Sequence, residues 1–175
     1  MPAAQTNYFQ LFALPEQFDI DVQLLEANYR KIQSASHPDR FVSASAAEKL
    51  ASMQLATQSN AAYTTLKNPA SRAKYLLELH DINAVADTNT ALPTDFLMQQ
   101  MEWREHLEDA KAEKNIPALE NLYNELRNEA KAMQAGLADL FDAKKDYASA
   151  TEETRKLIFI DKVSTDIHQA IEHLD

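Results

Sequence analysis

Hydrophobic residues recur at helical spacing along most of this chain. Over residues 21–36, Val22, Leu25, Tyr29 and Ile32 follow one another three or four positions apart. That spacing puts them on one side of an α-helix. Either Asp19 or Asp21 is placed to cap the start of this helix.

A second helical pattern covers 43–67, and its start, Ser45-Ala46-Ala47-Glu48, matches a capping box. Asn68-Pro69 ends this helix and starts a shorter one over 70–79. The apolar segment 7–13 predicts a short first helix, so residues 1–79 predict two longer antiparallel helices with a short helix on each side. The inner face of the second long helix is expected to hold Ala51, Leu55, Ser59, Ala62 and Leu66.

Residues 80–93 lose this periodicity and are rich in Asp, Asn, Thr and Pro, which predicts an interdomain linker. Three longer helices should follow, one capped by Thr94 or Asp95 and ending near Lys114, one beginning at Asn115, and one over 150–174. Three amphipathic helices with short connections predict an antiparallel three-helix bundle over 94–175, and the fold class is all-α. The expected inner faces of the second and third bundle helices are Leu119, Leu122, Leu126, Ala130, Met133, Leu137 and Leu140, and Ile160, Val163, Ile167, Ile171 and Leu174.

The bundle carries more apolar side chains than its core needs. On a helical wheel, Phe96, Trp103, Leu107 and Ala110 fall together and form the core stripe of the first bundle helix. Its other apolar and acidic residues, and part of the apolar run 157–160, point elsewhere. Such patches mark partner surfaces, although packing against the N-terminal domain is an open alternative. The residues concerned are Leu97, Met98, Met101, Glu105, Glu108, Ile158 and Phe159.

Composition excludes several classes of site. The 175 residues include no cysteine, which excludes disulfides, thiolate metal sites and cysteine nucleophiles. The single glycine, Gly136, excludes the glycine-rich loops that hold phosphates or dinucleotides. We expect a soluble, cytoplasmic protein, since no apolar run is long enough to span a membrane and residues 1–10 lack the features of a signal peptide.

Charge and histidine spacing argue against nucleic-acid binding and catalysis. The net charge of −10 comes entirely from residues 80–175, which is the opposite sign to a nucleic-acid binder. No two of the five histidines lie four residues apart on one helix, so no metal site is expected. We therefore expect no cofactor and no enzymatic activity.

The tripeptide His37-Pro38-Asp39 lies between the two long helices of the N-terminal part. Proline disfavours the helical region for the residue before it, so His37 should leave the first helix. The short carboxylate of Asp39 is expected to accept from nearby backbone N–H groups. Arg30 and Lys31 lie on the outer face of the preceding helix, which by pattern alone is a solvated face.

With its flanking segments, this tripeptide makes the N-terminal part resemble a J-domain. The matching segments are residues 8–12 (YFQLF), 29–32 (YRKI), 37–41 (HPDRF) and 61–66 (AAYTTL). J-domains bind heat-shock-type chaperones and accelerate their ATP hydrolysis. The resemblance implies that the chaperone-binding residues here are Arg30, Lys31, His37, Pro38, Asp39 and Arg40.

The resemblance to one J-domain family, HscB, extends over nearly the full chain. It rests on residues 68–77 (NPASRAKYLL), 96–102 (FLMQQME) and 155–162 (RKLIFIDK). HscB proteins deliver the iron–sulfur scaffold protein IscU to the chaperone HscA. Two alternatives stay open: a J-domain protein with another client, and a helical interaction protein without a chaperone partner. The resemblance implies a scaffold-binding patch made of Leu97, Met98, Met101, Glu102, Glu105 and Phe159.

Overall fold

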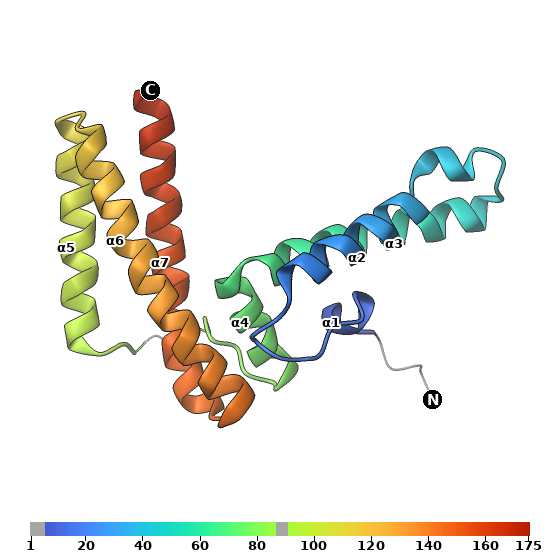
Figure 1. The fold of residues 1–175 in the computed structure, drawn as a ribbon, viewed down its shortest axis with the longest axis horizontal. Coiled ribbons are helices and arrows are strands. Elements are labelled where there is room, and N and C mark those ends of the chain that lie inside the picture. The colour runs from blue at the N-terminus through green and yellow to red at the C-terminus, as the bar shows by residue number, and fades with distance from the viewer. Residues whose placement is uncertain (1–5, 87–90) are drawn as a thin grey trace. The chain divides into compact units, whose positions relative to one another are not determined.

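A computed structural model of the chain describes residues 6–86 and 91–175, and every regular element in these ranges is helical (Figure 1). The chain divides into two compact units, Met1–Leu76 and Leu77–Asp175, which we call the N-terminal and C-terminal units. The boundary falls within the helix α4 (Pro69–Leu79). None of the described helices has the length and apolar character needed to cross a membrane.

Two helices, α2 (Val22–Ala35) and α3 (Ala46–Lys67), lie side by side and antiparallel in the N-terminal unit (Figure 1). A short 3-10 turn, η1 (Pro38–Phe41), lies between them, and α1 (Tyr8–Leu11) precedes them. Caps define their starts, because the side chains of Asp21 and Ser45 accept from the third backbone N–H of α2 and α3. These helices and the break at Asn68-Pro69 agree with the sequence prediction.

Aromatic packing joins α1 to the α2–α3 pair. Phe12 is buried and meets the ring of Tyr29 edge-on, with 6.2 Å between centroids. The Asn28 amide donates to the Phe12 carbonyl at 2.7 Å, which satisfies a backbone group where the chain leaves α1.

Arg72 of α4 is buried, donates to the Leu66 carbonyl at 2.8 Å and lies over the Phe18 ring. Its charge is thus accommodated by a backbone acceptor and an aromatic face.

The inner face of α3 differs from the prediction at one position. Ala51 is exposed, and Ser52 is buried in its place. Serine is tolerated on this face because its hydroxyl bonds within the helix: Ser52 Oγ donates to the Lys49 carbonyl at 2.8 Å. The serine predicted to complete the stripe, Ser59, is fully buried and is satisfied by the Ala56 carbonyl in the same way.

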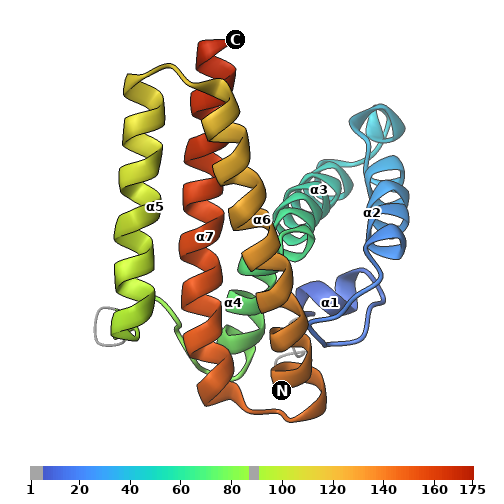
Figure 2. The same cartoon turned by 60° about the vertical axis from the view of Figure 1, so that its left-hand side comes forward.

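The C-terminal unit contains the predicted three-helix bundle. Its helices are α5 (Thr94–Ala112), α6 (Ile116–Ala138) and α7 (Tyr147–Leu174), which lie side by side in Figure 2. The prediction that Thr94 or Asp95 caps α5 is wrong, because the chain is already helical at Thr94 and the extended residue before it is Pro93. The buried core comprises Trp103, Leu107, Ala110, Leu119, Leu122, Leu126, Ile160, Val163 and Ile167.

A π-helical turn, η2 (Asp139–Ala143), ends α6 and changes the core register. A residue in a π turn rotates by less than in an α-helix. The inward position therefore moves from the predicted Leu140, which is half-buried, to Phe141, which is buried.

Charged side chains stabilise the turn between α6 and α7. Lys144 lies 2.9 Å from the carboxylate of Asp139, whose hydrogen bond and charge raise the pKa of that lysine. Asp146 caps α7, and the hydroxyl and N–H of Ser149 lower the pKa of its carboxyl. Because the lowered pKa favours the ionised form in the folded chain, this stabilisation is lost as the pH falls through the folded-state pKa of Asp146.

Part of the predicted linker packs into the C-terminal unit. Ala84 is fully buried, and the Arg155 guanidinium of α7 donates to the carbonyls of Ala84 at 2.8 Å and Ala91 at 3.1 Å. His80 stacks on Tyr147 at 4.1 Å between ring centroids. Residues 87–90 of the predicted linker lie outside the described residues, and the boundaries 1–79, 80–93 and 94–175 stay a prediction.

The two faces of α5 should differ in their effect on stability. Leu107 is 1% exposed, so we expect Leu107→Ala to lower the free energy of unfolding by about 2–5 kcal/mol through lost burial and a cavity. Leu97 is 44% exposed, and Leu97→Ala should cost less than about 1 kcal/mol. Urea unfolding followed by fluorescence of the single tryptophan, Trp103, measures both in the C-terminal unit. Equal losses would contradict the assigned core face.

Candidate functional site

The His37-Pro38-Asp39 loop begins where α2 is forced to end. The backbone N–H and the hydroxyl of Ser36 both donate to the Ile32 carbonyl, at 2.9 Å and 2.7 Å, and close the last turn of α2. His37 is extended, with φ −62° and ψ 134°, as predicted for a residue before proline. The loop is exposed at all three positions.

The hydrogen bond within this loop differs from the expected one. His37, and not Asp39, caps the short turn: its Nδ1 accepts from the Asp39 backbone N–H at 3.2 Å. The expectation for Asp39 is wrong because this residue lies inside the turn, beyond the capping position, and its carboxylate is 90% exposed. That carboxylate oxygen lies 3.6 Å from Nδ1. With Nδ1 accepting, neutral His37 carries its proton on Nε2, which is free to donate outward.

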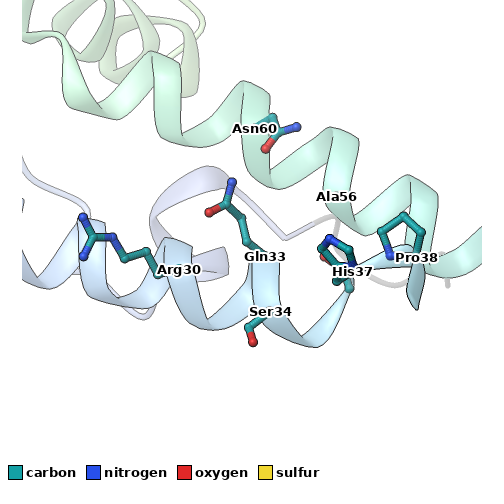
Figure 3. A pocket seen from close by; sticks show the side chains of 8 residues that line it. Arg30, Gln33, Ser34, His37, Pro38, Ala56 and Asn60 are labelled. Carbon is teal, nitrogen blue, oxygen red and sulfur yellow. The ribbon is translucent and has the colours of Figure 1, made fainter. Parts of the chain in front are cut away.

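A hollow of about 440 Å³ opens between α2 and α3 beside this loop (Figure 3). Three of the predicted chaperone-binding residues line it, namely Arg30, His37 and Pro38, and the other three, Lys31, Asp39 and Arg40, are exposed outside it. We call it the α2–α3 hollow. Its lining consists of Arg30, Gln33, Ser34, Ser36, His37, Pro38, Ala56 and Asn60.

The sequence prediction missed a polar network that crosses from α2 to α3 at this hollow. The Tyr29 hydroxyl lies 2.6 Å from Asn60 Oδ1 and accepts from Gln33 Nε2 at 2.8 Å. The ring of Tyr29 stacks on Tyr63 with 4.0 Å between centroids. These contacts depend on which residue of α3 lies opposite each residue of α2, and helical periodicity within each segment carries no such information.

A second candidate site is the outer face of α5. Leu97, Met98 and Met101 are 44%, 61% and 72% exposed, and Glu102 and Glu105 beside them are also exposed. At about 100° per residue, these five side chains cover one continuous sector of α5 away from its core stripe. With Phe159 we call this set the α5 surface. The prediction that Leu97, Met98, Met101, Glu105 and Glu108 point away from the bundle core is confirmed.

Phe159 differs from the other members of the α5 surface because it is half-buried. Its ring meets Phe96 edge-on at 6.1 Å between centroids. The Arg104 guanidinium lies 5.6 Å from the centre of the Phe159 ring and is held by Asp166 at 2.7 Å. Arg104 therefore covers part of Phe159, and the sequence prediction included neither Arg104 nor Asp166. Phe159 lies where the bundle core meets this surface.

Metal-ligating side chains are not gathered at either site in the part of the chain that the structure describes. Within that part, no group of three or more His, Asp or Glu side chains is placed to hold a metal ion. Most of the side chains at both sites are exposed and are therefore accessible to another protein.

Comparison with a family model identifies the C-terminal part of the chain. Residues 92–168 match the model described as the HSCB C-terminal oligomerisation domain. This range contains the whole α5 surface.

Full-length relatives and solved structures agree with this match. The co-chaperone protein HscB homolog of Paraburkholderia phymatum is 48% identical over 175 residues, covering 100% of this chain and 99% of the relative. That of Azoarcus sp. (strain BH72) is 46% identical over 171 residues, covering 98% and 97%. The structure of the chaperone HscB from Vibrio cholerae has a TM-score of 0.81 at 36% identity, covering 97% of this chain and 99% of that one. The human co-chaperone protein HscB has a TM-score of 0.84 at 29% identity, with 97% and 83% covered.

Methionine oxidation should report the exposure of both units. Met53, Met98 and Met101 are 64%, 61% and 72% exposed, whereas Met133 is half-buried against the bundle core. We expect hydrogen peroxide to oxidise the three exposed methionines several times faster than Met133, because the sulfur must be reached by the oxidant. Peptide mass spectrometry of the folded protein measures the four rates. If Met133 oxidised as fast as Met98, the assigned packing of α6 would be wrong.

Proposed function

Because this chain belongs to the HscB family of co-chaperones, we propose that it binds an IscU-type iron–sulfur scaffold protein and delivers it to an HscA-type chaperone, whose ATP hydrolysis it stimulates. The N-terminal unit is the J-domain, and the C-terminal helical unit binds the scaffold. The protein assists the maturation of iron–sulfur proteins in the cytoplasm and needs no cofactor of its own. An iron–sulfur cluster would be cargo on the scaffold.

The chaperone binds the N-terminal unit at the loop and α2. Arg30, Lys31 and Arg40 are exposed cations that steer the unit toward an acidic surface of the chaperone. His37 and Asp39 then make specific polar contacts. The Arg30 guanidinium is held by Glu26 at 2.8 Å, a surface ion pair that leaves most of its donors free.

The scaffold protein binds the α5 surface. Exposed leucine and methionine side chains provide apolar area, and methionine adapts its shape to a partner at low cost. Glu102 and Glu105 border these residues and favour a partner with basic groups. Phe159 gives the surface an aromatic anchor, of the kind that often dominates binding energy.

The proposed mechanism involves no bond chemistry on this chain. The J-domain stabilises the hydrolysis-competent state of the chaperone by binding that state more tightly than the others. The protein thus acts as an adaptor and not as an enzyme. The observation that carries this proposal is the exposed His37-Pro38-Asp39 loop in a chain that matches HscB co-chaperones over its full length.

Substitution of His37 should abolish chaperone stimulation without unfolding the protein. Both His37→Gln and His37→Asn remove the imidazole. His37→Asn places a favoured capping residue, with its side-chain acceptor, at the capping position of the turn. We expect both variants to stimulate the ATPase of an HscA-type chaperone at least tenfold less than the parent, with an unchanged melting temperature. A steady-state ATPase titration and circular dichroism measure the two effects.

The pair of variants separates local folding from recognition. If His37→Asn stimulated as well as the parent, the histidine would serve merely as a cap for the turn. Undiminished stimulation by both variants would refute the proposed chaperone site.

Truncation of two exposed residues on α5 should weaken scaffold binding. Leu97→Ala combined with Met101→Ala removes apolar contact area but no core residue, so we expect the free energy of binding to an IscU-type protein to fall by about 2 kcal/mol or more. Isothermal titration calorimetry measures it. Chaperone stimulation without the scaffold should be unchanged.

A control for this double variant lies in the same unit. Val85 is 47% exposed and outside the α5 surface, so Val85→Ala should leave scaffold affinity unchanged. Equal affinity of the parent, the control and the double variant would show that the scaffold binds elsewhere. Protection of Met98 and Met101, but not Met53, from oxidation in the complex would locate the contact independently.

A further inference from the structure

We infer that Asn60 of α3 is a specificity-determining residue that donates hydrogen bonds to an acidic side chain of the chaperone in the α2–α3 hollow. The inference rests on the proposed function and adds a residue of α3 to a site otherwise formed by α2 and the loop. It follows from the direction of the hydrogen bonds around Tyr29.

The network fixes which end of the Asn60 amide remains available to donate. The Tyr29 hydroxyl accepts from Gln33 Nε2, and its single proton is therefore available for Asn60 Oδ1 at 2.6 Å. Oδ1 is thus engaged, and both N–H bonds of Nδ2 remain to donate. Figure 3 shows the Asn60 nitrogen turned toward the end of the hairpin that carries His37 and Pro38.

The position of the Tyr29 hydroxyl is itself constrained. The Tyr29 and Tyr63 rings are nearly parallel, with an angle of 4° between their planes and 4.0 Å between centroids. The Tyr29 ring also meets the Phe12 ring in a T-shaped contact, with 82° between their planes. Because the ring is held on two sides, its hydroxyl holds Asn60 in one orientation before the partner arrives, which reduces the ordering cost of binding.

The polar groups around the hollow favour an anion. Asn60 Nδ2, His37 Nε2 and the Arg30 guanidinium supply N–H donors, and no carboxylate lines the hollow. Arg30 provides the one formal charge of the lining, and Glu26, which pairs with it at 2.8 Å, lies outside the lining. At about 440 Å³ the hollow has ample room for a carboxylate side chain. We therefore assign its occupant as an Asp or Glu of the chaperone, bound by charge-assisted hydrogen bonds.

The test reverses the hydrogen-bonding character of Asn60 at nearly constant shape. Asn60→Asp keeps an acceptor for the Tyr29 hydroxyl but replaces the donors with a carboxylate. We expect the co-chaperone concentration that gives half-maximal stimulation of an HscA-type ATPase to rise about tenfold or more, as for the loss of a hydrogen bond to a charged group. Tyr29→Phe, which keeps the ring but removes the hydroxyl that orients Asn60, should raise it about threefold.

A matched control adds the same charge to α3 elsewhere. Gln54 is exposed and does not line the hollow, so Gln54→Glu should leave the half-maximal concentration within about twofold of the parent. Circular dichroism should give the same helix content for all variants. If Asn60→Asp were unfolded, Tyr29→Phe and Asn60→Ala would provide the test, with the same direction of change.

The outcomes distinguish this inference from the proposed function. If the parent protein itself failed to stimulate the chaperone, the proposed function would be overturned, and this inference with it. If the parent stimulated and Asn60→Asp matched it, Asn60 would not contact the chaperone and the inference alone would fail. Equal weakening by Asn60→Asp and Gln54→Glu would indicate general charge repulsion and would also overturn it.

Discussion

The antiparallel pairing of α2 and α3 is the constraint on which the proposed chaperone site depends. Tyr29 lies against Tyr63, the Tyr29 hydroxyl reaches Asn60, and His37 and Ala56 line the same hollow. As the residue number increases along α2, the residue number of its neighbour on α3 thus decreases. This register brings together groups that are far apart in sequence, and it places the loop at the end of the α2–α3 hairpin. A slip of one helical turn would separate Tyr29 from Asn60 and dismantle the hollow.

In the C-terminal unit, the helix α5 carries apolar side chains on two faces, one buried in the bundle core and one exposed. Trp103 and Leu107 of α5 are buried against α6 and α7, whereas Leu97 and Met101 stay exposed. Exposed apolar side chains promote aggregation. The excess of acidic residues in 80–175 opposes it through charge repulsion.

Much of the fold follows from periodicity and capping, but the details of the site do not. Helix ends at Asn68-Pro69 and before Pro38 could be predicted because proline acts on its immediate neighbour. The burial of Ser52 in place of Ala51 could not be predicted. A serine whose hydroxyl is satisfied within its own helix can be buried, but by residue type it is read as a polar, exposed position. Phe141 replaced Leu140 because a π turn changes the rotation per residue. The Tyr29–Asn60 contact depends on the register between two helices, which neither helix encodes alone.

The central claim is that one chain carries both interaction sites and links the two partners. A mixing experiment tests it most directly, by measuring how an IscU-type scaffold changes the steady-state ATPase of an HscA-type chaperone. The full chain should give strong joint stimulation by scaffold and co-chaperone. An equimolar mixture of the His37→Gln protein with the protein altered at Leu97 and Met101 should not restore it, because neither molecule holds both partners. Full restoration by the mixture would contradict the account, since the two sites would then have no need to share one chain.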